Sequence, residues 1–150
     1  MDWQELTEAD LISSLNSLER EGYTSATISK GEDPASSILT NVAHEARGYL
    51  AGNAENVGMP DGAKIPAEAK AHVLAIARHR LLSWADISVS ADRVREFESA
   101  ERFLKLCSEG KVKVTPDSLS TPEATEENRA QPQWTDDRAT RFNRSSQEGI

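Results

Sequence analysis

Apolar residues recur at three- and four-residue spacing through the first two thirds of the chain, and this spacing predicts four α-helices. The predicted helices cover residues 7–21, 34–51, 66–84 and 90–109. Their expected buried faces are, in order, Ala9, Leu11, Ile12, Leu15 and Leu18; Ile38, Leu39, Val42, Ala46, Tyr49 and Leu50; Ala69, Val73, Ile76, Ala77, Leu81 and Trp84; and Val94, Phe97, Ala100, Phe103, Leu104 and Cys107. Short connections between helices predict an all-α domain, a small bundle of about four helices.

Capping residues mark where these helices should begin and end. Thr7, Asp33 and Ser90 carry side-chain oxygens that accept hydrogen bonds from the N–H groups of a first helical turn. Pro34 and Pro66 suit the first helical position, where an N–H group is not needed. Glycines after the apolar runs are expected to end three of the helices, namely Gly22, Gly52 and Gly110.

Three stretches fall outside the predicted helices. Residues 23–33 and 53–66 contain turn-forming glycine, asparagine, aspartate and proline, and we expect both to be loops. Residues 111–114 alternate polar and apolar side chains, which predicts a short C-terminal strand.

The composition changes near residue 114. Beyond it lie three prolines, many serines and threonines, and four larger hydrophobic residues: Leu119, Trp134, Phe142 and Ile150. Such a segment buries too little apolar surface to offset the entropy lost on ordering. We therefore predict a helical domain over residues 1–114 and an extended tail over residues 115–150, disordered alone and ordered on a partner.

Charge and hydropathy exclude several classes of protein. The chain carries 25 acidic and 17 basic residues, a net charge of −8, and no run of lysines or arginines. Sequence-specific DNA binding is not expected, because nucleic-acid binders carry a basic patch. No apolar run approaches the roughly 18–20 residues that span a bilayer. The first residues also lack the apolar stretch of a secretory signal, so we expect neither membrane insertion nor secretion.

Candidate catalytic and metal-binding residues are few. Glu68 and His72 lie four residues apart on one predicted helix, but no third ligand follows at a suitable spacing. Cys107, the single cysteine, lies on an apolar helix face, as a buried structural thiol does. Phosphate-binding loops and serine or zinc hydrolase motifs are missing from the sequence. We therefore predict a protein that is not an enzyme and that uses neither a metal nor a cofactor.

The last predicted helix interleaves acidic and basic residues. Opposite charges recur three or four residues apart in the pairs Arg93 and Glu96, Asp92 and Arg95, Glu98 and Arg102, and Glu101 and Lys105. This pattern is typical of a solvated face with intrahelical ion pairs. It would equally suit an interface between subunits, and spacing alone does not choose between the two.

The tail combines two aromatic residues with arginines at three-residue spacing: Trp134, Arg138, Arg141, Phe142 and Arg144. One interpretation is a solvated polar tail with blocks of charge. The other is an arm that folds onto a partner, anchored by the aromatic rings, with arginines pairing with carboxylates or phosphates. Two aromatic residues in a segment otherwise poor in apolar side chains favour the arm.

Three short strings follow one another along the chain: ARGYLAG at residues 46–52, IARHRL at 76–81, and RVREFESAERFL at 93–104, the last followed by EGKV at 109–112. Together with the order of the elements, they resemble the head–tail connector family of tailed phages, in its Mu-like prophage branch. These proteins are also called adaptor or head-completion proteins. The resemblance covers residues 5–114. The chain departs from the family in a longer, more polar loop before Pro66 and in the tail after Pro116.

This resemblance implies a structural virion protein without enzymatic activity, which forms a homo-oligomeric ring of about a dozen copies between the portal and the tail. Such a ring would extend the DNA channel and help to retain packaged DNA, which passes through without sequence-specific binding. The implied partners are the portal protein and a tail or tail-completion protein. The implied location is the neck of the virion, after assembly in the host cytoplasm.

A closed ring requires two different surfaces on each subunit. The candidate subunit interface comprises Arg78, Arg80, Arg95, Glu98 and Arg102. The candidate residues for binding the portal or a neighbour are Trp134, Arg138, Arg141, Phe142 and Arg144, and those for facing the channel are Glu55 and Asp61. The alternative function is a cytoplasmic helical interaction module whose C-terminal tail binds a regulatory partner. Self-assembly on a portal would separate the two hypotheses.

Overall fold

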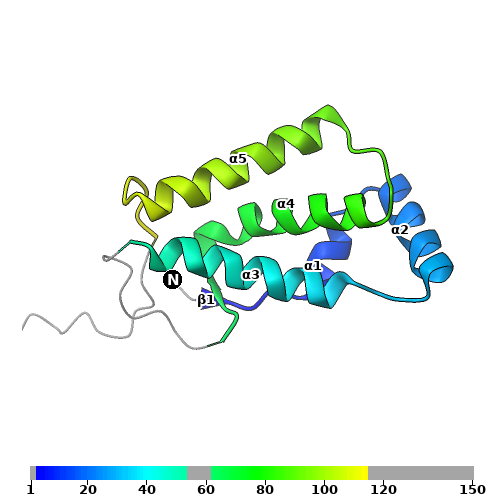
Figure 1. Cartoon of the computed structure of the whole chain (residues 1–150), viewed down its shortest axis with the longest axis horizontal. Helices are drawn as coiled ribbons and strands as arrows, with labels where there is room; N and C mark the ends of the chain where they lie inside the picture. The colour runs from blue at the N-terminus through cyan, green and yellow to red at the C-terminus, as the bar shows by residue number, and fades with distance from the viewer. Residues whose placement is uncertain (1–2, 54–61, 115–150) are drawn as a thin grey trace, which may run out of the picture. The chain divides into compact units, whose positions relative to one another are not determined.

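The computed structural model describes residues 3–53 and 62–114, which form five α-helices and one two-stranded sheet (Figure 1). The elements are β1 (Trp3–Gln4), α1 (Glu8–Ser13), α2 (Ser17–Lys30), α3 (Ala35–Ala51), β2 (Ile65–Pro66), α4 (Ala67–Trp84) and α5 (Ala91–Ser108). The chain divides into two units, Met1–Leu119 and Ser120–Ile150, and every described residue lies in the first. The predicted all-α class is confirmed. Within the described ranges, no helix is both long and apolar enough to cross a membrane.

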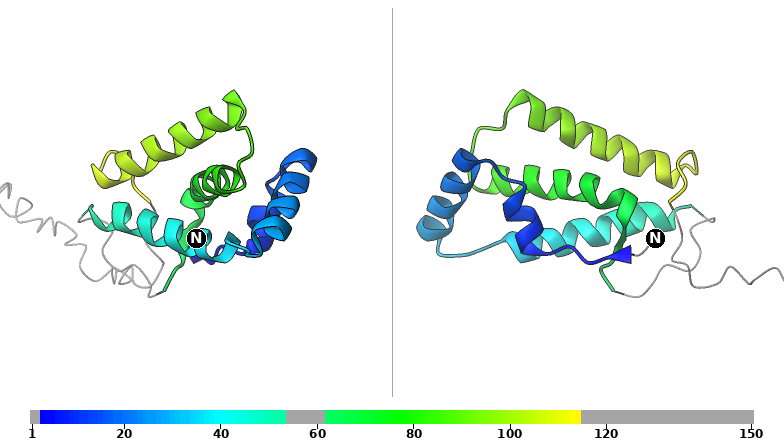
Figure 2. Two further views of the ribbon diagram at one scale, coloured as in Figure 1. Left: turned by 45° about the vertical axis from the view of Figure 1, so that its right-hand side comes forward. Right: turned by 180° about the vertical axis from the view of Figure 1, so that it is seen from behind.

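The core lies between α3, α4 and α5, which run side by side (Figures 1 and 2). The central helix is α4, because in addition to α3 and α5 it contacts α1, α2 and both strands. Its buried residues are Ala69, Val73, Ala75, Ile76, Ala77, Leu81 and Leu82. A helix covered on two sides needs apolar residues around more of its circumference than one stripe. The apolar stripe predicted for this helix is therefore narrower than the surface that the helix buries. The predicted stripe also included Trp84, which is only half-buried.

Two of the predicted helix starts are confirmed by their caps, and a third lies within one residue of its predicted position. The Ser90 hydroxyl accepts a hydrogen bond from the Arg93 N–H at the start of α5. Asp33 Oδ1 accepts one from the Ala35 N–H, 3.1 Å away, but the N-cap of α3 is Pro34, so this helix begins one residue later than predicted. Thr7 caps α1, since its hydroxyl accepts from the Asp10 N–H. Each cap depends on a few consecutive residues, so the sequence alone suffices to place it.

The prediction of a single helix over residues 7–21 is wrong, because this part of the chain belongs to two helices. Asn16 interrupts it and caps α2: its side chain accepts from the Glu19 N–H at 2.8 Å, and its own N–H donates to Glu19 Oε2 at 2.9 Å. This reciprocal capping box starts a new helix in a new direction. Figure 2 shows α2 crossing the end of the three-helix bundle. The predicted loop over residues 23–33 is consequently mostly helical.

Gly22 does not end a helix, contrary to the prediction. It lies within α2, where a β-carbon would stand 2.7 Å from Cδ1 of Ile87. Its role is close packing against the segment that follows α4. The helix ends instead at Gly31, whose φ of 70° is the left-handed conformation that glycine adopts without strain.

The predicted strand at residues 111–114 does not form. The described strands are β1 and β2, which pair antiparallel with Trp3 opposite Pro66 and Gln4 opposite Ile65. Residues 111–114 follow a left-handed turn at Gly110 and have no described strand beside them. Val114 is buried with Trp3 and Cys107 in a second apolar cluster. The alternation of polar and apolar residues therefore reflects the burial of Val114. A strand would also need a neighbouring strand to accept its hydrogen bonds.

Candidate functional site

A network of charged side chains joins the start of α2 to α5. Arg93 binds Glu19 with two hydrogen bonds, from Nε to Oε1 at 2.9 Å and from Nη2 to Oε2 at 3.0 Å. Glu19 is the one charged residue buried within the described ranges, with 7% of its surface exposed. Two-pronged pairing of this kind fixes the relative orientation of the two side chains.

The network extends onto α4 through a second carboxylate. Arg78 on α4 hydrogen-bonds Glu96, and Arg93 also donates to Glu96 Oε2 at 3.1 Å. Both arginines donate to the carbonyl oxygen of Ser14, each at 3.3 Å, in the turn between α1 and α2. Two guanidinium groups therefore hold that turn against two helices that lie far away in the sequence.

The pKa values of the network follow from these contacts. Burial would raise the pKa of Glu19, but hydrogen bonds from Arg93 and the Asn16 N–H favour the carboxylate and lower that pKa overall. The hydrogen bond to Glu19 raises the pKa of Arg93. Burial, together with the neighbouring charge of Arg93, lowers the pKa of Arg78. All three groups keep their charges at neutral pH, so the network stays intact there.

Two residues of the predicted subunit interface are engaged within the chain. Arg78 belongs to the network above. Arg80 lies on the other side of α4 and pairs with Glu45 of α3 at 2.6 Å. Their positive charges are already neutralised by glutamates of the same chain. Arg78 and Arg80 are therefore less available for ion pairs with a neighbouring subunit than the exposed charged residues of α5.

The other three predicted interface residues lie on the outer face of α5 and are exposed: Arg95, Glu98 and Arg102. Arg95 pairs with Asp92 at 3.6 Å, which confirms one predicted intrahelical pair, and Arg93 with Glu96 confirms another. The predicted pairs Glu98 with Arg102 and Glu101 with Lys105 do not form. Glu98 and Arg102 make no ion pair with any described residue. This face therefore presents both signs of charge to solvent.

A second exposed surface lies on α2 and was not predicted from the sequence. Leu18 and Ile28 are 77% and 78% exposed, although Leu18 was predicted to be buried. Tyr23 and Ala26 face the bundle instead. The cause is the break at Asn16, which starts α2 in a new phase and direction. Its signal was present in the sequence as asparagine followed three residues later by glutamate.

Two histidines of α4 lie against aromatic rings of α5. His72 stacks on Phe103 with ring centroids 4.0 Å apart, and His79 stacks on Phe97 at 4.1 Å. Burial lowers the pKa of His72, so this ring is neutral at physiological pH. Among the described residues, no three histidine, cysteine, aspartate or glutamate side chains gather as metal ligands would. His72 serves helix packing here.

Cys107 is buried in the second apolar cluster, as predicted. Burial raises the pKa of its thiol, because the thiolate is poorly solvated there. A thiol in this state lacks the thiolate character that nucleophilic cysteines require.

The remaining predicted site residues lie outside the described ranges. These are the channel-facing candidates Glu55 and Asp61 and the tail candidates Trp134, Arg138, Arg141, Phe142 and Arg144. Comparison of the chain with protein families, with curated proteins and with solved structures gave no match.

Proposed function

We propose that the protein is a structural virion subunit, a head–tail connector that assembles into a ring between portal and tail. Two lines of support bear on this proposal. The first is the resemblance of residues 5–114 to that phage family. The second is a pair of unlike exposed surfaces on separate helices of one unit.

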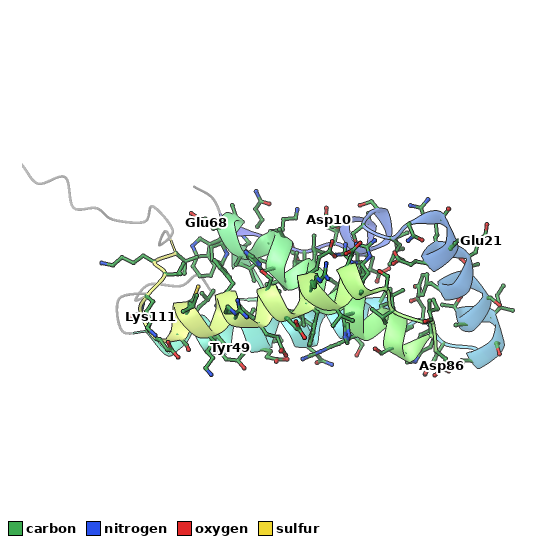
Figure 3. The ribbon with its side chains drawn as sticks, turned by 90° about the horizontal axis from the view of Figure 1, so that it is seen from above. Asp10, Glu21, Tyr49, Glu68, Asp86 and Lys111 are labelled. Atoms are coloured by element: carbon green, nitrogen blue, oxygen red, sulfur yellow. The ribbon has the colours of Figure 1, made fainter. Side chains whose placement is uncertain are left out.

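The pair of surfaces carries the proposal. The outer face of α5 is charged and includes Glu98 and Arg102, while α2 exposes the apolar side chains of Leu18 and Ile28. Figure 3 places Glu21 of α2 at one end of the unit and Tyr49 and Lys111 at the other. Closed rings are built from heterologous contacts, in which one patch meets a different patch of the next copy. A subunit with two dissimilar patches suits that geometry.

The remaining parts of the chain have roles in this proposal too. Residues 115–150, with Trp134 and Arg138, would reach the portal or the neighbouring copy. Glu55 and Asp61 would face the channel, where negative charge lets DNA pass without adhering. The net charge of −8 agrees with such a lumen.

The deciding experiment is cryo-electron microscopy of the full chain mixed with the portal protein from the same genome. We expect a closed ring coaxial with the portal channel, with α5 of one copy facing the next. A chain that stays monomeric beside an intact portal would overturn the proposal. A cytoplasmic interaction module with a partner-binding tail would then be the better explanation.

A matched pair of variants tests the role of α5. Arg102→Glu reverses an exposed charge within the proposed seam, and we expect it to reduce ring formation on the portal at least tenfold. Lys64→Glu makes the same change of charge at an exposed position before β2, and we expect normal assembly. Equal assembly by the two variants would remove α5 from the seam.

A further inference from the structure

The outer face of α2 carries an open hollow of about 540 Å³ whose surface is mostly apolar. It is lined by residues of this one helix: Ser17, Arg20, Glu21, Thr24, Ser25 and Ile28. The buried residues of α2 are Glu19, Tyr23 and Ala26, so the hollow lies on the side of the helix that faces away from the bundle. Ile28 and the nearby Leu18 are the most exposed large apolar side chains among the described residues. Such a surface is stabilised when another protein surface covers it.

Two unpaired charges flank this hollow. Arg20 and Glu21 are both exposed, and neither forms an ion pair with a described residue. Arg20 makes only a long hydrogen bond, at 3.4 Å, to the carbonyl oxygen of Ile12. Because consecutive side chains of a helix diverge by about 100°, the two charges lie on opposite sides of the hollow. The mostly apolar surface is thus bordered by a cation on one side and an anion on the other.

The outer face of α5 carries the matching pair of charges. Glu98 and Arg102 are exposed, lie one helical turn apart, and form no ion pair with a described residue. The aliphatic part of an arginine side chain covers apolar surface while its guanidinium group reaches a carboxylate. Arg102 can therefore lie over Ile28 and pair with Glu21. Glu98, one turn away, then meets Arg20.

These two faces cannot meet within one copy of the chain. The two hydrogen bonds between Glu19 and Arg93 hold the inner side of α2 to α5, and the hollow faces away from that side. Figures 1 and 2 show α2 crossing one end of the bundle, whereas α5 runs along its length. Each copy therefore offers both faces to other copies, as a heterologous contact requires.

We propose that the hollow of α2 binds the outer face of α5 of a second copy, with Glu21 paired with Arg102 and Arg20 paired with Glu98. This contact rests on the proposed ring and names the two faces that meet at each seam. It covers Ile28, and the two pairs of opposite charge fix the register of one helix on the other.

An exchange of charges in the full-length chain tests the contact, with rings on the portal protein from the same genome counted by electron microscopy. Glu21→Arg and Arg102→Glu should each reduce ring formation at least about tenfold, because each places like charges opposite one another. The double variant restores an opposite pair and should assemble to within about threefold of the wild type. The control combines Glu21→Arg with Lys64→Glu. It has the same net charge as the double variant but leaves two arginines facing each other, so assembly should stay low.

Cysteine cross-linking distinguishes this contact from a pairing of two α2 helices. Ser25 of α2 and Ser99 of α5 are small and exposed, so they suit positions where two helices approach closely. On mild oxidation with the portal present, Ser25→Cys combined with Ser99→Cys should give covalent oligomers of more than two chains. Ser25→Cys alone should stay monomeric, and a covalent dimer of this variant would overturn the proposal. The native Cys107 is buried and does not compete.

The outcomes separate this contact from the ring itself. If the double variant assembles no better than the single variants, or if Glu21→Arg assembles normally, the contact is wrong while the proposed ring stands. If the wild-type chain forms no ring on the portal, the proposed function and this contact fail together. Far-UV circular dichroism of each variant confirms that the helices remain, so that a loss of rings reports on the seam.

Discussion

Two regions of the unit are held together by different kinds of contact. The helices α3, α4 and α5 meet through apolar side chains, most of them completely buried. By contrast, α2 buries little apolar surface and is fastened by charges at both ends. Near its start Glu19 binds Arg93, and at its end Lys30 lies 4.7 Å over the Trp84 ring and pairs with Asp86 at 3.1 Å.

The difference predicts unequal stability within one unit. Apolar burial scales with area and involves no protonation, and a small bundle that shares one apolar core should unfold cooperatively. Ion pairs depend on geometry and on the protonation of each partner. Regions with few buried apolar contacts open at lower free energy than the global unfolding. We therefore expect α2 to open before the bundle does.

The largest effect is expected in the bundle. Leu81 is completely buried on α4, so Leu81→Ala should lower the free energy of unfolding by about 4 kcal/mol through lost burial and a cavity. Leu18→Ala removes the same atoms from an exposed position and should change the free energy of unfolding by less than about 0.5 kcal/mol. Urea denaturation followed by circular dichroism measures both. Similar losses for the two variants would mean that α2 is covered in solution.

A smaller and more local effect is expected at the attachment of α2. Glu19→Gln leaves the Arg93 guanidinium with a neutral partner and should cost about 2 kcal/mol. Hydrogen exchange should show faster exchange for amides of α2 than for those of α4. Glu21→Gln changes an exposed glutamate two residues away and is the control. Uniform loss of protection across α2 and α4 would show that the two regions unfold together.

Substitutions at two glycines distinguish the effect of helix propensity on stability from the effect of packing. Gly48 lies within α3, and no neighbouring atom lies within 4 Å of the place where an alanine methyl group would stand, so Gly48→Ala should raise stability by about 1 kcal/mol. Gly22→Ala should fail to gain this amount, because Ile87 must move aside. Thermal unfolding compares the two variants directly. An equal gain at both sites would mean that α2 does not pack closely on the segment after α4.

The smallest effect concerns pH. Burial lowers the pKa of His72 in the folded state, so the unfolded chain takes up the proton first as pH falls through 6.5. The free energy of unfolding should therefore decrease below pH 6.5. His72→Gln should flatten this part of the profile, and His44→Gln, which replaces an exposed histidine, is the matched control variant. Urea titrations between pH 5 and pH 7.5 provide the measurement, at about half-unit intervals.

Sequence reasoning was most successful where the signal was local. The cap at Ser90 and the Asp33–Pro34 start placed α5 and α3 within about one residue of their true starts. It failed at Asn16, because the apolar spacing continued across the break and Leu18 fitted the same stripe. Gly22 was interpreted as a helix end for the same reason, since a glycine that permits close packing looks identical in sequence to one that ends a helix.

The sequence by itself determined the all-α class and the limits of the three long helices, because capping and periodicity depend on neighbouring residues. Tertiary structure decided what these helices meet. The pairing of Glu19 with Arg93 joins residues 74 positions apart, and a small hollow lined by Leu6, Leu39 and Ala63 draws on three separate segments. Such contacts depend on how the chain folds back on itself, and residue spacing carries no record of that path.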